Sequence, residues 1–497
     1  MLSCQQQIYI QFSILTSMEK KKPTPTPPPL LSPKKEEAKI LKQVDIKLKK
    51  HKTMSLSIKE GSFSAASFGL GNSYITPYAL ALKANNAQIG FLTSFMSLLS
   101  PLAQLYSSKL MEKFTRKKII IITVILQALM WLPIISLSIL FSKNIYQAYL
   151  PTILIIFYAT YALIGALASP PWFSLMGDLV PEKARGRYFS KRNRITGTFS
   201  VLAIITGGFI LDYFKTKGYV LIGFAIIFFI ASITRLISGA YFTKHYEPKL
   251  KLHKGYYISF WEFLINLPKK NFGKFTIFIT LMHFTVYIAS PFFAVYMLKE
   301  LQFSYLTYMI ITLSSTVATL IIYPLWGRFT DDYGNIQLLR IVSILIPLIP
   351  ILWLFSSNPY YLIFVPQLIG GVAWAGFFLS SSNFIYDSIP QERRALFVAY
   401  YNILNGVGIF LGAGLGGLLA QYLSITFMNK LLFIFLISGI ARALIVLIFS
   451  WKIKEAKKTK QIRKGKFKGI KPIQCVVNEV IATGFSLKKH GWVNFSR

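Results

Sequence analysis

Few residues in the apolar stretches of this chain could carry out chemistry. The one titratable side chain near the middle of such a stretch is His283, whereas Asp178, Asp212 and Asp387 fall at the ends of theirs. A histidine can carry a proton or contact a ligand near neutral pH; the alternative is a neutral, hydrogen-bonded histidine packed among helices. The sequence contains no H-E-x-x-H motif, no cluster of His, Asp and Glu, and no G-x-x-x-x-G-K-[ST] loop. These absences argue against an enzyme, a metal site and ATP-driven chemistry, and no cofactor is expected.

The elements that must hold these residues are long and apolar. The 497 residues are 54% hydrophobic and 15% charged, against roughly 45–50% apolar and about 25% charged in a soluble domain. Such stretches cross a hydrocarbon core only as helices, because no water is present there to pair the backbone. The sequence therefore predicts an all-α polytopic membrane protein with twelve transmembrane helices. They lie near residues 62–82, 88–108, 119–141, 147–175, 195–214, 218–242, 275–298, 304–326, 336–356, 359–386, 396–423 and 429–451.

The excess of positive charge carries information about topology. Lys and Arg number 55 and Asp and Glu 18, a net charge of +37 that would otherwise suggest a nucleic-acid binder. Loops on one side of the predicted membrane hold 22 of the Lys and Arg residues, whereas the opposite loops hold six. Because loops rich in Lys and Arg stay in the cytoplasm, we expect both termini to be cytoplasmic, in a multi-pass protein of the cell membrane. Nucleic acid is then not needed as a partner.

Both ends of the chain are predicted to be basic cytoplasmic tails, residues 1–61 and 452–497. Their lysines are placed to contact anionic lipid. The two cysteines of the chain, Cys4 and Cys475, lie in these tails, on the reducing side of the membrane. No disulfide framework or thiolate metal site is therefore implied.

The predicted helices form two related halves. Residues 178–208 match the segment 209 positions later at eight of 31 positions, including Asp178 with Asp387, where about two matches are expected at average composition. We expect an N-terminal six-helix lobe over 62–242 and a C-terminal six-helix lobe over 275–451. In such a two-lobed protein the substrate site lies between the lobes, near the middle of the membrane.

A cytoplasmic linker, residues 243–274, joins the predicted lobes. Its stretch 255–275 interleaves aromatic side chains such as Trp261 with lysines such as Lys269 and Lys270. This mixture favours a helix lying in the lipid headgroup layer. A solvated linker that happens to contain aromatic residues is the alternative.

Two predicted cytoplasmic loops contain related short motifs. The loop between predicted helices 8 and 9 reads Gly327-Arg328-Phe329-Thr330-Asp331-Asp332-Tyr333-Gly334-Asn335. Its counterpart between helices 2 and 3 runs from Ser108 to Lys118, with Glu112 in place of the aspartate. Both motifs resemble the signature G-x-x-x-D-R-x-G-R-R of the major facilitator superfamily. The resemblance covers residues 62–451 and implies the twelve-helix transporter fold of that family.

The signature loops imply a gate on the cytoplasmic side. A carboxylate just past one helix can face the N-terminus of another, where unpaired N–H groups carry partial positive charge. By the resemblance, Glu112 would face the start of helix 11 and Asp331 the start of helix 5 when the protein faces outward. Loop charges that only set topology are the alternative. The implied gate residues are Ser108, Glu112, Lys113, Arg116, Asp178, Arg185, Gly327, Asp331, Gly334, Asp387 and Arg394.

The resemblance also implies that helices 1, 4, 7 and 10 line a central cavity. A few polar groups in an apolar, aromatic wall suit a small organic solute, although each residue alone could simply be packed. Since no carboxylate lies among them, a neutral or anionic solute is favoured over a cationic one. The implied cavity residues are Asn72, Tyr74, Tyr158, Tyr161, His283, Tyr287, Trp374 and Asn383.

The sequence as a whole predicts a secondary transporter that moves a small organic solute across the membrane by alternating access. We expect it to work as a monomer in the lipid bilayer. The direction of transport and the use of a coupling proton stay open. The alternative is a receptor or lipid-handling protein that kept the fold without transporting, a reading prompted by the degenerate first signature loop.

Overall fold

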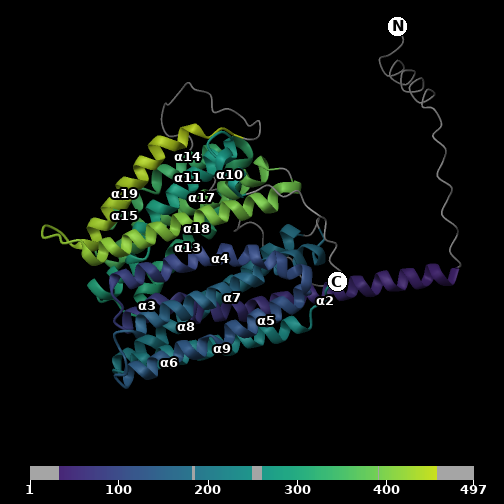
Figure 1. Ribbon diagram of the computed structural model, residues 1–497, viewed down its shortest axis with the longest axis horizontal. Coiled ribbons are helices and arrows are strands. Elements are labelled where there is room, and N and C mark those ends of the chain that lie inside the picture. Colours follow the sequence, from purple (N-terminus) through teal and green to yellow (C-terminus); the bar gives the residue numbers. More distant parts are fainter. Residues whose placement is uncertain (1–32, 182–184, 249–259, 390, 456–497) are drawn as a thin grey trace, which may run out of the picture. The chain divides into compact units, whose positions relative to one another are not determined.

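The chain divides into two units, Met1–Lys52 and Thr53–Arg497. In the first unit the described residues form the beginning of helix α2, with an ion pair of 2.6 Å between Lys49 and Asp45. All other elements belong to the second unit. The remainder of both predicted tails and part of the predicted linker lie outside the described residues. The residues described by this computed structural model (Figure 1) are 33–181, 185–248, 260–389 and 391–455.

The second unit consists of two bundles of helices; in Figure 1 the first is drawn in purple to teal and the second in teal through green to yellow. The N-terminal lobe contains the part of α2 (Pro33–Leu70) from Thr53 onward, η1 (Asn72–Tyr74), α3 (Ile75–Ala81), α4 (Asn86–Lys113), α5 (Arg116–Leu129), α6 (Trp131–Ser142), α7 (Leu150–Leu179), α8 (Arg185–Thr216) and α9 (Val220–Thr243). The C-terminal lobe contains α10 (Phe260–Asn266), α11 (Asn271–Ala289), α12 (Phe292–Val295), η3 (Tyr296–Glu300), α13 (Tyr305–Tyr333), α14 (Asn335–Leu345), α15 (Leu348–Leu352), α16 (Pro359–Leu362), η4 (Ile363–Gln367), α17 (Leu368–Ser388), α18 (Gln391–Tyr422), α19 (Lys430–Phe449) and η5 (Ser450–Lys452).

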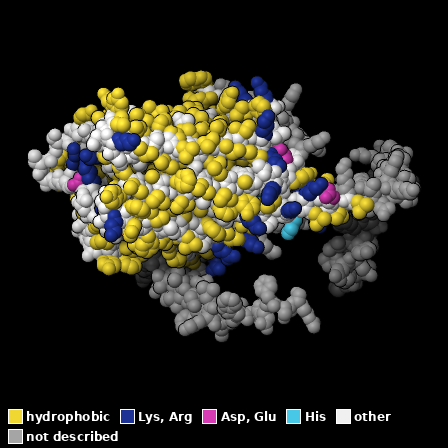
Figure 2. Space-filling view, turned by 90° about the horizontal axis from the view of Figure 1, so that it is seen from below, with side chains coloured by type: hydrophobic (Ala, Val, Ile, Leu, Met, Phe, Trp, Pro, Cys, Tyr) yellow, Lys and Arg dark blue, Asp and Glu magenta, His cyan; other side chains and the backbone are white. Residues whose placement is uncertain are grey.

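Eleven helical segments of the described chain are long and apolar enough to cross a membrane. The twelfth predicted span, 62–82, corresponds to the end of α2 together with η1 and α3. The first half of α2 is rich in lysine, so this helix also runs through much of the segment predicted as a tail. Figure 2 shows a broad face of hydrophobic side chains with Lys and Arg at both of its ends. The prediction of an all-α, multi-pass membrane fold is confirmed.

The spans have two ends, which we call the basic end and the opposite end. The basic end is the end at which α4 meets α5, near Arg116, and α13 meets α14, near Gly334. The opposite end is the end at which α3 meets α4, near Asn85, and η3 meets α13, near Ser304. Asn85 and Ser304 are both N-caps: their side-chain oxygens accept hydrogen bonds from the backbone N–H groups of Gln88 and Thr307.

The first and seventh spans, which correspond in the predicted repeat, are both broken near the opposite end. In the first span α2 ends at Gly71, where an added Cβ would lie 2.3 Å from the Trp131 side chain. In the seventh span α11 gives way to α12 at Pro291, which has no backbone N–H to continue the helix. These breaks let short helices pack across the end of the bundle.

Helix α2 carries a polar stripe on the face that packs against α5, α8 and α9. The stripe contains a carboxylate, Glu60, which is only 5% exposed. Glu60 accepts a hydrogen bond of 3.0 Å from Ser238 Oγ and lies 3.6 Å from the guanidinium of Arg192. The sequence placed Glu60 in a tail, but this part of α2 is packed into the lobe. The members of the stripe recur at three- or four-residue spacing: Thr53, Ser57, Glu60, Ser64 and Ser67.

The short helix α10 occupies part of the predicted interfacial stretch. Its Phe263 side chain is 6% exposed and packs against Phe397 and Tyr400 of α18. Trp261 and Ile265 are 72% and 66% exposed. A helix with one face on the protein and large apolar side chains on another suits a headgroup layer, and its membrane contact stays a prediction.

His245 anchors the segment that follows α9 through a ring stack and a backbone hydrogen bond. Its ring stacks on Phe242 at 4.3 Å between centroids, and its backbone carbonyl accepts a hydrogen bond of 2.9 Å from Lys117 Nζ. The side chain is 2% exposed. Burial, and to a lesser degree the nearby charges of Lys117 and Arg192, lower the pKa of His245 to about 4.

This pKa predicts a loss of stability in acid. Because the folded protein holds His245 neutral, its contribution is complete above the unfolded pKa of about 6.5 and is lost as the pH falls from 6.5 toward 4. The apparent unfolding temperature should therefore drop more steeply over this range in the natural protein than in His245→Phe, which keeps the ring stack. Parallel pH profiles for the two proteins would contradict the assignment.

Candidate functional site

A cavity of about 1140 Å³ lies between the two lobes. Its N-terminal wall comes from η1, α3, α4 and α7, and its C-terminal wall from α11, α17 and α18. The lining residues nearest the basic end are Gln104, Tyr386 and Val398, whereas Ile75 and Leu92 lie deepest, toward the opposite end. The cavity is therefore a polar and aromatic space that reaches toward the basic end.

Four of the eight predicted cavity residues line this space: Asn72, Tyr158, His283 and Tyr287. They come from η1 and α7 on one wall and from α11 on the other. These elements belong to the predicted helices 1, 4 and 7. Helix 10 does not line the cavity with the two residues predicted there; its lining residues are Phe377, Phe378, Ser381, Ser382, Ile385 and Tyr386.

The other four predicted residues do not line the cavity. The hydroxyl of Tyr74 is buried and donates a hydrogen bond to the Ile204 carbonyl. Trp374 packs against Phe377 and Phe378 on its own helix, and Asn383 is half-buried on α17, outside the lining. Tyr161 lies behind Asn72 and lines a smaller neighbouring pocket of about 150 Å³.

Asn72 is held in place by two stacked tyrosines. Tyr161 donates a hydrogen bond of 2.9 Å to Asn72 Oδ1, and Asn72 Nδ2 donates one of 3.1 Å to the Tyr158 hydroxyl oxygen. The two tyrosine rings are stacked with centroids 5.7 Å apart. Behind them, Gln127 Nε2 donates to the Tyr161 carbonyl and its Oε1 accepts from Arg235. This wall is a rigid polar network that reaches the cavity surface at Asn72 and Tyr158.

The C-terminal wall presents polar atoms that are less fully paired. Two of its lining residues, His283 and Ser381, have a buried side-chain atom, Nδ1 and Oγ respectively, with no hydrogen-bond partner among the described residues. Nearby, Asn405 Oδ1 accepts a hydrogen bond of 3.2 Å from Thr280. An unpaired buried polar atom costs free energy, so this wall is the one that would gain from a bound polar group.

Sequence reasoning missed the contribution of α4 and α18. Ser97, Ser100 and Gln104 line the cavity from α4, and Asn402 and Asn405 from α18. Within each helix these residues are three or four positions apart, so they share one face. That spacing was visible in the sequence, but the family resemblance directed attention to helices 1, 4, 7 and 10.

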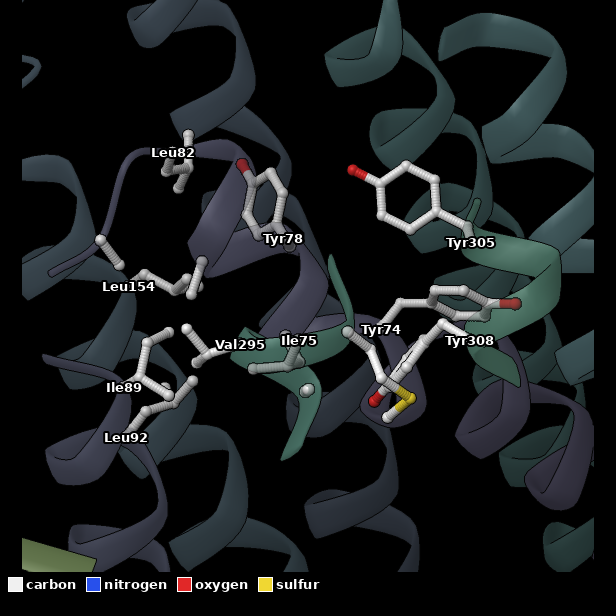
Figure 3. Close-up of a cluster of buried hydrophobic side chains, with 14 of the residues drawn as sticks. Tyr74, Ile75, Tyr78, Leu82, Ile89, Leu92, Leu154, Val295, Tyr305 and Tyr308 are labelled. Carbon is white, nitrogen blue, oxygen red and sulfur yellow. The ribbon is translucent and has the colours of Figure 1, made fainter. Parts of the chain in front are cut away.

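The cavity is closed at the opposite end. Hydrophobic and tyrosine side chains of both lobes pack there, and we call them the closing cluster (Figure 3). Tyr78, for example, donates a hydrogen bond of 3.0 Å to the Ile134 carbonyl and packs edge-on against Phe228 at 5.0 Å. The labelled members of the closing cluster are Tyr74, Ile75, Tyr78, Leu82, Ile89, Leu92, Leu154, Val295, Tyr305 and Tyr308.

An aspartate joins the two lobes beside the closing cluster. Asp212, near the end of α8, accepts hydrogen bonds from the backbone N–H groups of Tyr305 (2.8 Å) and Leu306 (3.0 Å) at the start of α13. The carboxylate thus caps the N-terminus of a helix in the other lobe, where partial positive charge is exposed. We call this contact the Asp212 latch. An added Cβ at Gly208, one turn earlier, would lie 3.2 Å from Leu306 Cα, so the two helices touch closely here.

At the basic end the predicted gate residues fall into two groups. The first group makes contacts inside each lobe: Arg116, 1% exposed, forms an ion pair of 2.7 Å with Asp178, and Asn335 Nδ2 donates a hydrogen bond of 2.9 Å to Asp387. Arg116 and Asn335 occupy the same place in the two signature loops, as do Asp178 and Asp387 in the predicted repeat. The contacts of the two lobes are therefore related by the repeat.

Among the described residues, the second group makes no such contact between charged side chains: three of its members are exposed, and two are glycines. Glu112, Lys113 and Asp331 are exposed, and an added Cβ at Gly327 would meet no atom within 4 Å. Gly334 joins α13 to α14 with a φ of +94°, a conformation that favours glycine. The side chains of Ser108, Arg185 and Arg394 lie outside the described part of the structure. The predicted contacts of Glu112 and Asp331 with the starts of α18 and α8 are thus not tested.

Metal chemistry finds no support in the described residues, which contain no group of three or more His, Cys, Asp and Glu residues that could hold an ion. The cavity residues offer hydroxyl, amide, imidazole and aromatic groups instead. Such groups bind and orient a solute.

Comparison with known proteins gives one long match and two short ones. A family model described as Major Facilitator Superfamily matches residues 61–268 and 275–494. The "Uncharacterized transporter C460.03" of Schizosaccharomyces pombe is 34% identical over 114 residues, 23% of this chain and 20% of that protein. The "Vacuolar basic amino acid transporter 2" of Saccharomyces cerevisiae is 31% identical over 111 residues, 22% of this chain and 23% of that protein. The chain therefore matches less than a quarter of the length of either relative.

Solved structures resemble this chain over most of its length. The crystal structure of the nucleoside transporter NupG has a TM-score of 0.59 at 15% identity, covering 80% of this chain and 100% of that one. A bacterial homologue of the iron transporter ferroportin in an inward-facing state has a TM-score of 0.59 at 14% identity, covering 80% and 98%. At these identities the likeness shows the fold alone.

Proposed function

We propose that this chain, which belongs to the Major Facilitator Superfamily, is a secondary transporter. The members of that family are transporters and not enzymes. In our proposal the protein moves a small organic solute by alternating access. The observation that carries the proposal is the cavity between the lobes, which is closed at the opposite end by the closing cluster and the Asp212 latch and reaches toward the basic end. A solute that enters from the basic end would leave at the opposite end once these contacts open and the basic end closes.

Helices α8 and α13 provide one physical means by which one end of the molecule could open while the other closes. At the opposite end, Asp212 of α8 caps the start of α13. At the basic end, Asp331 near the end of α13 is placed by the resemblance to face the start of α8. The two helices run antiparallel, so each would offer a carboxylate to the N-terminus of the other. In our proposal the Asp212 latch holds the present state and the Asp331 contact holds the alternative one.

The proposal includes an orientation and a setting. With both termini cytoplasmic, as the loop charges predict, the basic end is cytoplasmic and the described state faces inward. The basic tails would lie beside anionic lipid of the cell membrane, and the protein would act as a monomer. The cavity offers no carboxylate to a basic amino acid, so the substrate named for the budding-yeast relative is not part of this proposal.

Solute flux tests the proposed function. The purified full chain is reconstituted in liposomes, and uptake of a broad panel of labelled metabolites is measured with and without a pH gradient. Uptake of one solute class above protein-free liposomes supports the proposal, and stimulation by the gradient would add a coupling proton to it. Folded protein that carries none of the panel would favour the non-transporting receptor or lipid-handling alternative.

The Asp212 latch gives a second test, by substitution. Asp212→Ala removes a helix cap, which costs about 1 to 2 kcal/mol and should shift the ratio of the two states about 5- to 30-fold toward the state open at the opposite end. The readout is the rate at which an impermeant maleimide added at that end labels Leu92→Cys, in a background of Cys4→Ser and Cys475→Ser. Leu92 is a member of the closing cluster that also lines the cavity. Asp212→Asn, which keeps one acceptor, should fall between. Equal labelling in all three proteins would contradict the latch.

A further inference from the structure

We propose that the cavity selects uncharged organic solutes bearing hydroxyl or amide groups, held between Tyr158 on the N-terminal wall and His283 on the C-terminal wall. The inference rests on the proposed function and adds to it a substrate class and two specificity-determining residues.

The first argument is the charge of the lining. The residues that line the cavity include no Asp, Glu, Lys or Arg within the described chain. Taking an ion out of water costs several kcal/mol unless a partner of opposite charge replaces the lost hydration. A charged side chain behind the N-terminal wall, Arg235, already donates to Gln127 and Ser64. A cation or an anion would therefore enter this space without a counter-charge, whereas an uncharged polar solute would not need one.

The second argument is the direction of the hydrogen bonds on the N-terminal wall. The Tyr158 oxygen accepts from Asn72 Nδ2, and Asn72 Oδ1 accepts from Tyr161. The hydroxyl proton of Tyr158 has no acceptor among the described residues. Because Tyr158 is 5% exposed and lines the cavity, this proton is available to a solute. The network thus fixes a hydrogen-bond donor at one point of the wall, matched by a hydroxyl or carbonyl oxygen of the solute.

The third argument is the unpaired nitrogen on the facing wall. His283 lines the cavity, yet its Nδ1 is buried with no hydrogen-bond partner among the described residues. The ring is held at its edges by Tyr287 and Phe377, with centroids 6.4 Å and 6.1 Å away. A solute that displaces this ring slightly and supplies a hydroxyl or amide group would pair the nitrogen. Binding would then remove a cost that the empty protein carries.

The size and the aromatic content of the cavity favour a solute with a ring. Tyr287, Phe377 and Tyr401 border the space, which at about 1140 Å³ exceeds what one small ring fills, so water accompanies the solute. Hydroxyl and amide groups on an uncharged ring are the chemistry shared by nucleosides and hexoses. The aromatic borders can stack on a planar base but offer less to a saturated sugar.

A comparison of uptake rates for four solutes tests the substrate class. Reconstituted full-length protein is presented with uridine, glucose, lysine and succinate, which differ in charge and in planarity. We expect uridine or glucose to be carried, and lysine and succinate to be carried at least about tenfold more slowly. Preference for uridine would identify the planar class, and preference for glucose the saturated one. Preferential transport of lysine or succinate would overturn the inference and leave the proposed function standing, whereas transport of no solute at all would overturn the proposed function and this inference with it.

Two substitutions test the residues. Tyr158→Phe keeps the ring stack but removes the hydrogen-bond donor. His283→Phe keeps an aromatic ring at this position but removes both nitrogens. Each variant should weaken the apparent affinity for the carried solute about 3- to 10-fold. Tyr360→Phe, at a site 73% exposed and remote from the cavity lining, is the matched control and should leave affinity unchanged. Unchanged affinity in both cavity variants, measured on folded protein, would overturn the assignment.

Discussion

A disulfide across the opposite ends of α8 and α13 is expected to stop solute flux completely, and a reducing agent to restore it. Gly208→Cys and Leu306→Cys place two thiols where an added Cβ at residue 208 would lie 3.2 Å from Leu306 Cα. The two Cα atoms are therefore at most about 4.7 Å apart, near the short end of the range that a disulfide spans. The bond would make permanent the inter-lobe contact that Asp212 now holds. The measurement is uptake into liposomes by protein lacking Cys4 and Cys475, before and after oxidation.

Each single cysteine variant serves as the control for the disulfide. Oxidation should leave its flux unchanged, because no partner thiol is near. Full flux through protein shown to be crosslinked would mean that the lobes need not separate at this end. The alternating-access proposal would then be wrong.

The second large effect concerns stability. Helix α18 packs against α11 through three glycines four residues apart, and an added Cβ at Gly412 would lie 2.2 Å from the Phe284 carbonyl oxygen. The same Cβ at Gly408 or Gly416 would lie 2.6 Å or 2.1 Å from the carbonyl oxygens of Thr280 or Ile288. Backbone atoms cannot move aside as a flexible side chain can, so even a methyl group must push the helices apart.

Gly412→Ala is therefore expected to destabilise the protein by about 1 to 3 kcal/mol or more, and to reduce the yield of folded protein. Gly414→Ala is the matched control on the same helix: its nearest neighbour would be Ser94 Oγ at 3.6 Å, an ordinary contact. Because alanine favours helix over glycine, this variant should be as stable as the natural protein or more so. Comparable unfolding temperatures for the two variants would contradict the close packing of α18 on α11.

Much of the fold could be predicted from the sequence because a bilayer imposes a simple rule. Any long apolar stretch that crosses the bilayer must be a helix, and the loop charges predict the orientation of each helix across the membrane. The exception is the first span, whose predicted start at residue 62 follows hydropathy, whereas α2 is packed into the lobe from Thr53 onward. Its stripe is polar because it faces other helices, so hydropathy alone could not separate it from the lysine-rich part of α2. The helical spacing of Ser57, Glu60 and Ser64 was the available signal.

The site was less predictable than the fold. Asn72, Tyr158, His283 and Tyr287 line the cavity, because an unusual polar or aromatic residue in a span often faces another helix or a cavity. Sequence could not separate them from Tyr74, which is equally polar but donates its hydroxyl to a backbone carbonyl. Which face of a helix turns toward the cavity depends on contacts between spans distant in the sequence.

Some acidic residues make contacts within one lobe and another joins the two lobes, a distinction that the sequence could not make. Asp178 and Asp387 make contacts within their own lobes, with Arg116 and Asn335. Asp212, which the sequence marked only as lying at the end of its span, is the carboxylate that joins the lobes. A carboxylate that contacts its own lobe and one that contacts the other lobe look alike in sequence, because the difference depends on the tertiary fold.

The central claim is that the two ends of the molecule open and close in alternation, and paired distances between spin labels test it most directly. One pair, Lys118→Cys with Tyr333→Cys, spans the lobes at the basic end, and the other, Tyr219→Cys with Tyr360→Cys, spans them at the opposite end; all four sites are exposed. Measured in liposomes with and without a transported solute, and with Asp212→Ala, the first distance should shorten whenever the second lengthens. Distances that stay fixed, or that lengthen together, would contradict the account.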